Sequence, residues 1–269
     1  MKEVMTTLWK DANYKPQLPY IVNQFITEYD IAKANINVLL YKKAITEDQY
    51  NELYNSEKDY REIRIGLMER YNPKISEIKA QGIMEFRKMF CEANELQDQD
   101  ILTIKNDAIY VIGKFPINTK FYNITFVRKC TYTLFMLLDK LEVYYGCDPI
   151  TGYEVIDIKG INDNTLLLHK DYMITFLCDV FYKLQNGAPQ DAANTCSDFL
   201  EKYLRLELDV GFYREFNSRS QYRFDSSVSS FYFDHIEQDQ LKNINTDVNL
   251  SIIRSLMGHV YDITRNKLG

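Results

Sequence analysis

The stretch from Ile101 to Ile112 most constrains the fold, because two short apolar runs flank a polar tip of Lys105, Asn106 and Asp107. Ile, Val and Tyr suit half-buried strands, whereas Asn and Asp tolerate the backbone geometry of a turn. The pattern therefore predicts a tight β-hairpin. Such a hairpin would present the Asp107 carboxylate at the end of two core strands. That acid could take part in metal-assisted chemistry, or it could be an ordinary solvated turn residue.

A second acid closes another apolar run. Residues 20–30 end at Asp30, and residues 31–40 carry apolar side chains at helical spacing. This order predicts a strand or loop that delivers Asp30 directly to a helix. Asp30 could equally be the N-cap of that helix, which is a common use of aspartate. The sequence leaves both interpretations open.

The sequence between the two acids predicts helices. Residues 46–49 are typical of a helix start, and residues 75–96 predict a long amphipathic helix. Lys58, Arg61 and Arg64 recur at intervals of three, so they share one face of a helix. They could bind a triphosphate, or they could form a solvated face that is salt-bridged to nearby acids.

The segments after the hairpin indicate the fold class. Residues 121–158 contain several strand-like runs separated by turn residues, which predicts a largely antiparallel sheet. Residues 169–184, 191–208 and 248–267 are helical by their apolar period. Helices that follow a sheet in this way predict an α+β protein with a helical C-terminal part.

Composition excludes several classes of protein. The net charge of −6 argues against non-specific coating of nucleic acid, so any such contact must come from a local basic patch. The five cysteines show no CxxC spacing and there are only three histidines, which does not make a zinc site. No apolar run approaches the roughly 18–20 residues that span a bilayer. Scattered cysteines without a signal peptide suggest reduced thiols and a cytoplasmic protein.

The order of these segments resembles the palm and thumb of a family B DNA polymerase. In that family an Asp followed by small and apolar residues begins a helix, and residues 30–35 (Asp-Ile-Ala-Lys-Ala-Asn) are similar. The family's Asp-Thr-Asp-Ser hairpin is matched by residues 105–111. Its basic, Tyr-containing element resembles residues 128–132 (Arg-Lys-Cys-Thr-Tyr), and its later Lys-Gly step resembles residues 158–161.

The chain also departs from the family pattern. Lys105 replaces the first Asp of the hairpin motif, which leaves Asp107 as the corresponding metal-binding acid. The fingers motif, with its Lys and Asn-Ser-x-Tyr-Gly, is not recognisable, and only a short arm precedes Asp30. The resemblance spans roughly residues 25–225, and it carries weight as an ordered set of four motifs.

The resemblance implies a specific organisation and chemistry. It implies an N-terminal arm over residues 1–24, a palm-like antiparallel sheet flanked by helices over residues 25–161, and a helical thumb-like region over residues 162–269. It further implies a viral, Mg²⁺-dependent nucleotidyltransferase similar to DNA polymerases, in which Asp30 and Asp107 are the catalytic and metal-binding acids.

The implied partners are DNA or a primer–template, a nucleoside triphosphate, and a protein that supplies the missing subdomains; no membrane is involved. A viral protein of this kind would act in the host cytoplasm. The alternatives are a catalytically inactive polymerase-like module that binds nucleic acid or protein, and a structural or assembly protein. The residues implied in nucleic-acid binding are Arg128, Lys129, Tyr132, Lys159, Arg214, Arg219 and Arg223, and those implied in nucleotide binding are Lys58, Arg61 and Arg64.

Overall fold

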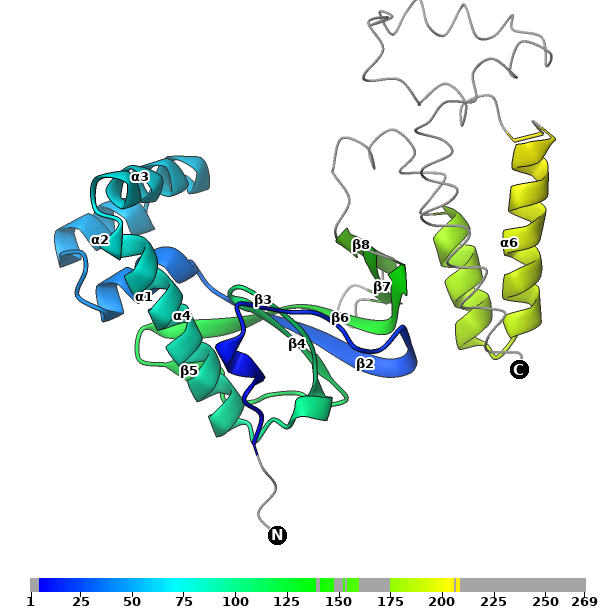
Figure 1. Ribbon diagram of the computed structural model, residues 1–269, viewed down its shortest axis with the longest axis horizontal. Coiled ribbons are helices and arrows are strands. Elements are labelled where there is room, and N and C mark those ends of the chain that lie inside the picture. The colour runs from blue at the N-terminus through cyan, green and yellow to red at the C-terminus, as the bar shows by residue number, and fades with distance from the viewer. Residues whose placement is uncertain are drawn as a thin grey trace, which may run out of the picture. The chain divides into compact units, whose positions relative to one another are not determined.

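The computed structural model describes residues 5–138, 141–147, 152, 154–159, 175–205 and 207–208. These residues form helices and an antiparallel sheet, so the predicted α+β class is confirmed (Figure 1). The chain divides into two compact units, each described below by itself. Unit 1 comprises residues 1–18, 24–132 and 148–152, and unit 2 comprises residues 19–23, 133–147 and 153–269.

The sheet of unit 1 is built around the predicted hairpin. Strands β3 (Ile101–Lys105) and β4 (Ala108–Ile112) pair antiparallel, with Lys105 opposite Ala108 across a two-residue turn. Asn106 in that turn has a φ of 52°, a left-handed conformation that Asn tolerates. The strand order is β1 (Asn13–Tyr14), β3, β4, β2 (Tyr20–Ile31) and β6 (Ile124–Leu138), and β5 (Lys120–Phe121) pairs with β6.

Four α-helices connect β2 to β3. They are α1 (Ala34–Tyr41), α2 (Glu47–Tyr54), α3 (Lys58–Tyr71) and α4 (Lys74–Ala93). The predicted start of α2 is confirmed by a capping box, in which Thr46 and Gln49 each satisfy the backbone N–H of the other. Two short 3₁₀ helices, η1 (Leu8–Lys10) and η2 (Asp98–Asp100), flank this region of the chain.

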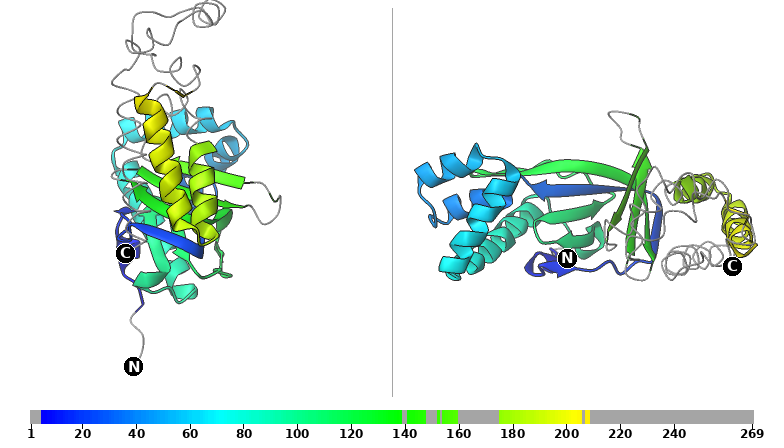
Figure 2. Two further views of the ribbon diagram at one scale, coloured as in Figure 1. Left: turned by 90° about the vertical axis from the view of Figure 1, so that its right-hand side faces the viewer. Right: turned by 90° about the horizontal axis from the view of Figure 1, so that it is seen from above.

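The core of unit 1 lies between α4 and the sheet. Figure 2 shows α4 running along one face of the strands, and its buried Ile83, Phe86 and Phe90 belong to one cluster with Tyr29 and Ile31 of β2. Each buried Phe side chain of this kind contributes about 1.5–3 kcal/mol through removal from water. The apolar stripe that the sequence predicts for residues 75–96 is therefore part of the hydrophobic core, where it packs against one face of the sheet.

Unit 2 contains the remaining strands and the helical segments. Its strand order is β2, β6, β7 (Leu141–Cys147) and β8 (Glu154–Lys159), because β2 and β6 each run through both units. A helix over residues 175–185 packs on β7, with the rings of Phe181 and Tyr145 5.6 Å apart. The helix predicted over residues 191–208 is α6 (Pro189–Leu204), and the helix predicted over residues 248–267 lies outside the described residues. Within the described ranges, no helix has the length and apolar character needed to cross a membrane.

The close packing of α1 against α4 can be tested at Gly82, with Gly66 as the comparison. A Cβ atom on Gly82 of α4 would overlap Val38 Cγ1 of α1, whereas a Cβ on Gly66 of α3 would meet nothing within 4 Å. We expect Gly82→Ala to lower the free energy of unfolding by about 1–3 kcal/mol through overpacking. Gly66→Ala should raise it by about 0.5–1 kcal/mol, because Ala favours the helix. Urea denaturation of both variants measures this contrast, and a stabilised Gly82→Ala protein would contradict the described helix packing.

Candidate functional site

The structure brings the two predicted acids together. Asp107 occupies the turn between β3 and β4, and the residue after it, Ala108, lies opposite Asp30 in the β2–β4 register. The carboxyl groups of Asp30 and Asp107 are close enough to share a hydrogen bond. The antiparallel pairing of β2 with β4 thus brings together Asp30 and Asp107, which are 77 positions apart in the sequence. Both acids are partly buried at the edge of the unit 1 sheet.

Burial and the proximity of Asp107 together raise the proton affinity of Asp30. Burial contributes most, followed by the charge of Asp107 and the hydrogen bond with it, and together they raise the pKa of Asp30 from 3.8 to about 6. Two carboxylates at such close range repel each other unless a proton or a cation lies between them. The pair is therefore suited either to retain a proton or to bind a metal ion.

A lysine from the neighbouring strand partly neutralises the pair. Lys129 of β6 places its Nζ atom 3.8 Å from Asp30 Oδ2, and its charge works against the rise in the Asp30 pKa. The Lys129 side chain is 51% exposed, so this ion pair is weak and open to competition from solvent ions. Arg128 beside it is also exposed. Both predicted cations are thus exposed, and Lys129 lies next to Asp30, whereas the charge of Arg128 acts on Tyr29.

Asp30 does not cap the helix that follows it. It belongs to β2, and α1 begins at Ala34 with Lys33 as its N-cap in a left-handed conformation, φ 47°. The N-cap interpretation is therefore wrong, and the interpretation of a strand delivering Asp30 is correct. The reason is that β2 continues its pairing with β4 as far as Asp30 itself, which leaves the turn to residues 32 and 33.

Asn37 supports the turn after Asp30, and the sequence interpretation missed it. Its Nδ2 donates to the Ala32 carbonyl at 2.6 Å, while its Oδ1 accepts from the Tyr50 hydroxyl at 2.8 Å. Asn37 is only 5% exposed, so these bonds satisfy a polar group that would otherwise be costly to bury. The sequence signal that could have indicated this role is a polar residue at a buried position among the apolar residues of α1.

Arg87 supports the turn that carries Asp107, and it was also missed. It lies on α4 with 2% exposure, and its Nη1 donates to the Asn106 carbonyl at 3.0 Å and to the Asp11 carbonyl at 2.6 Å. Its spacing of four from both Ile83 and Cys91 puts it on the buried stripe of α4. An arginine at a core position of an amphipathic helix was the sequence signal.

Lys105 does not provide the positive charge that acts on Asp30. Its Nζ lies 6.0 Å from the centre of the Tyr110 ring, and the cation that lowers the Asp30 pKa is Lys129. The replacement of an acid by Lys105 nevertheless leaves the site with two carboxylates. Within the ranges that the structure describes, no group of three or more His, Cys, Asp or Glu side chains could hold a metal ion.

Two carboxylates still fit Mg²⁺. This ion takes oxygen ligands and is commonly held by one or two carboxylates, with water and substrate phosphates completing its shell. Asp30 and Asp107 provide such oxygen donors, and Lys129 at 3.8 Å from Asp30 offsets only part of the effect of burial and of the neighbouring carboxylate on the pKa of Asp30. The described residues therefore suit a metal that is shared with a phosphate substrate better than one held by protein alone.

The predicted triphosphate residues lie on α3. Lys58 and Arg64 are exposed, whereas Arg61 is half-buried and its Nη1 donates to the Ser56 carbonyl at 3.3 Å. Asn35 at the start of α1 donates to Glu62 Oε2 at 3.0 Å, which ties α3 to the segment that follows Asp30. Triphosphate binding by these cations stays a prediction.

The other predicted nucleic-acid contacts have different surroundings. Tyr132 is 2% exposed and its hydroxyl donates to Glu28 Oε2 at 3.3 Å, so its ring presents no face for stacking. Lys159 belongs to β8 in unit 2, where its Nζ lies 2.5 Å from Asp157 Oδ2. Arg214, Arg219 and Arg223 lie outside the described residues.

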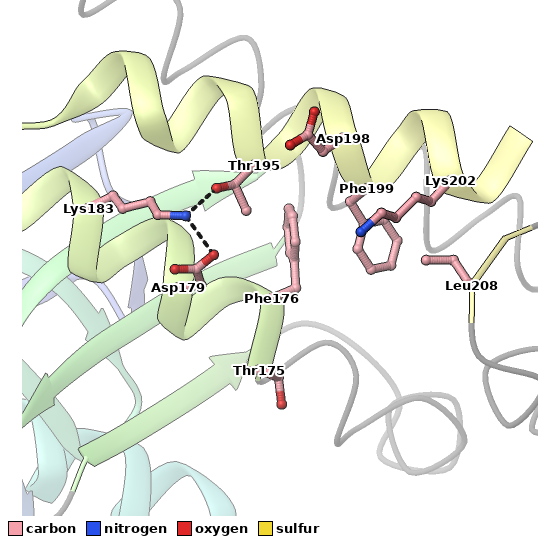
Figure 3. Close-up of a pocket in the computed structure, with 9 residues that line it drawn as sticks. All are labelled: Thr175, Phe176, Asp179, Lys183, Thr195, Asp198, Phe199, Lys202 and Leu208. Atoms are coloured by element: carbon pink, nitrogen blue, oxygen red, sulfur yellow. Dashed lines mark hydrogen bonds and ion pairs between the residues drawn. The ribbon is translucent and has the colours of Figure 1, made fainter.

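Unit 2 contains a separate pocket of about 620 Å³ between the helix over residues 175–185 and α6 (Figure 3). The rings of Phe176 and Phe199 lie 5.0 Å apart in it. Lys183 Nζ is held there between Asp179 Oδ2 at 2.8 Å and Thr195 Oγ1 at 2.6 Å. None of the residues that the sequence predicts for catalysis or binding lines this pocket.

The raised pKa of Asp30 predicts how stability depends on pH. Because the folded pKa of about 6 exceeds the unfolded value near 3.8, the folded protein binds more protons between these values. The stabilising contribution is fully present below pH 3.8 and is lost as the pH rises through about 6. A shift of this size corresponds to a loss on the order of 3 kcal/mol in the free energy of unfolding.

Asp107→Asn should reduce that pH dependence, because the charge and carboxyl hydrogen bond of Asp107 are lost together while the contribution from the burial of Asp30 remains. Denaturant titrations at several pH values between 4 and 7.5 measure the effect. Asp48→Asn on the exposed first turn of α2 is the matched control, and it should keep the wild-type slope. Identical slopes in all three proteins would contradict the described acid pair.

One comparison with known proteins identifies a family. A family model described as Bacteriophage PBS1 gene 130 protein matches residues 4–261. No curated protein matches the chain.

Proposed function

Because the chain belongs to the family of the bacteriophage PBS1 gene 130 protein, we propose that it is a phage nucleotidyltransferase that acts on DNA through the acid pair Asp30 and Asp107. The family description supports the viral origin that the sequence predicted. It names no activity and does not mention a DNA polymerase. The proposal therefore depends on the chemistry of the site.

The observation that carries the proposal is the convergence of Asp30, on β2, with Asp107, in the turn that leads into the adjacent strand β4. Asp30 lies in the β2–β4 pair and Asp107 lies in the two-residue turn between β3 and β4, and these strands pack on a helix-covered core. Nucleotidyl transfer needs carboxylates held rigidly at such a sheet edge, because the phosphoryl group must lie in line with the attacking hydroxyl.

In the proposed function, Asp30 and Asp107 hold Mg²⁺. When bound, the ion would neutralise phosphate charge and promote attack by a primer hydroxyl. Arg128 and Lys129, two exposed cations of β6, would bind the phosphates of the nucleic-acid backbone. The cations of α3 would bind the triphosphate. A partner protein that completes the nucleotide site, and action in the host cytoplasm, remain part of the proposal.

A second function is favoured by the ion pair of Lys129 with Asp30. A lysine that occupies the acid pair reduces the negative potential that attracts metal, and the described residues provide no third carboxylate for compensation. The alternative is a phage module that binds nucleic acid through Arg128 and Lys129 without catalysis. It differs from the first function in needing neither the metal nor both acids.

Primer extension separates these functions. We expect wild-type protein with Mg²⁺ or Mn²⁺ to extend a primed DNA template, and Asp30→Asn or Asp107→Asn to reduce the rate at least 100-fold. The near-isosteric Asn variants remove charge while preserving shape. Asp48→Asn should extend at the wild-type rate. Absence of extension by wild-type protein that still binds the template would favour the non-catalytic module.

Lys129→Met tests the cation next to the acids. Loss of a phosphate contact should weaken binding to DNA and lower the slope of log affinity against log salt concentration by about 1. Removal of a positive charge about 4 Å from Asp30 should also strengthen Mn²⁺ binding by roughly 5-fold. Fluorescence anisotropy with labelled DNA and Mn²⁺ titration followed by electron paramagnetic resonance measure the two effects.

Lys74→Met at the exposed start of α4 is the matched control, because it removes the same charge at a distance from the acids. Unchanged DNA affinity and unchanged Mn²⁺ affinity in Lys129→Met would count against any role of this lysine at the site.

A further inference from the structure

Arg87 is a buried cation directly beneath the candidate site. Its side chain is 2% exposed on α4, and two of its contacts are to backbone carbonyls, at Asn106 and at Asp11. Its Nε atom has no hydrogen-bond partner among the described residues. An arginine with an incomplete set of partners is costly to bury, so packing alone does not account for its position.

We propose that Arg87 is the positioning residue that fixes Asp107 in the orientation required for metal binding. This inference rests on the proposed function of the acid pair. The carbonyl that Arg87 binds belongs to the peptide group that joins Asn106 to Asp107. Holding that peptide plane fixes the backbone torsion that leads to the Asp107 side chain, although Arg87 does not itself touch a substrate.

The turn gains from such an anchor because a short hairpin loop has little internal support. Asn106 has a φ of 52°, and a two-residue turn has few internal hydrogen bonds with which to maintain one conformation. The guanidinium group is planar and rigid, so a bond from Nη1 sets direction as well as distance. The charge of Asp107 also acts on Arg87: burial lowers the guanidinium pKa, and the nearby carboxylate partly offsets that effect.

The N-terminal arm is the third member of this arrangement. Arg87 binds the Asp11 carbonyl, the Asn106 N–H donates to the Ala12 carbonyl at 2.7 Å, and Asn13 of β1 pairs with Lys105. The arm, the hairpin turn and α4 are therefore joined at one buried guanidinium. The arm thereby becomes part of the support of the acid site.

Three variants separate the charge of Arg87 from its shape. Arg87→Lys keeps the positive charge but loses the planar group, and Arg87→Met keeps a long side chain without charge or donors. Lys88→Met on the same helix is the matched control, because Lys88 is exposed and its Nζ lies near Glu92, at 3.7 Å, and the Trp9 ring, at 5.4 Å, rather than at the hairpin turn.

The first measurement is hydrogen exchange of the Asn106 amide, which needs no metal or substrate. Its bond to the Ala12 carbonyl should open more often when Arg87 no longer holds the turn. We expect at least 10-fold faster exchange in Arg87→Met, an intermediate value in Arg87→Lys, and the wild-type value in Lys88→Met. Unchanged exchange in a folded Arg87→Met protein would overturn the proposal.

The second measurement is Mn²⁺ affinity, followed by electron paramagnetic resonance. Mutation of a group that holds a metal ligand in place typically weakens metal binding 10–100-fold. We expect a weakening of that size in Arg87→Met, and in primer extension a lower kcat with an unchanged KM for primer–template. Weaker primer–template binding with unchanged Mn²⁺ affinity would contradict a positioning role.

The two proposals fail in different ways. If wild-type protein neither binds Mn²⁺ nor extends a primer, the proposed function fails, and so does the metal-orienting role of Arg87. If wild-type protein binds Mn²⁺ but Arg87 variants bind it equally well, only the positioning role fails. Should Arg87→Met not fold, Arg87→Lys decides the question by the same two measurements.

Discussion

The antiparallel pairing of β2 with β4 is the constraint on which the candidate site depends. It places Asp30 opposite Ala108 and therefore next to Asp107 in the preceding turn. Side chains alternate between the faces of a strand, so a register shift by one residue would turn Asp30 toward the opposite face and separate the acids. The register is maintained by the same alternation, because Tyr29 and Ile31 on either side of Asp30 are buried under α4.

Each acid also depends on a polar side chain from a helix. Asn37 of α1 binds the carbonyl of Ala32 after Asp30, and Arg87 of α4 binds the carbonyl of Asn106 before Asp107. Buried polar groups of this kind are costly unless they are bonded, but they specify one conformation where apolar packing alone allows several. The helices thus determine the orientation of the acid-bearing turns as well as covering the sheet.

Electrostatics sets two opposing tendencies at this edge of the sheet. Burial and mutual repulsion favour a proton or a cation between Asp30 and Asp107, while Lys129 from β6 provides part of the compensating charge. In the proposed function, the competition between Mg²⁺ and Lys129 for the acid pair separates the metal-dependent enzyme from the binding module. The net charge of −6 does not exclude the proposed contact with nucleic acid, because Arg128 and Lys129 are both exposed on β6.

The sequence by itself determined the local elements: the hairpin with Asp107 at its tip, the amphipathic α4 and the α+β class. These follow from periodicity and turn chemistry, which act between near neighbours in the chain. It also named both acids, but it could not decide whether Asp30 was a helix cap, nor show that Tyr132 is buried. Only the tertiary structure decided these points, and only it revealed Asn37, Arg87 and the Lys129–Asp30 pair. The physical reason is that strand register and buried hydrogen bonds join residues far apart in sequence, where local patterns carry no information about distance.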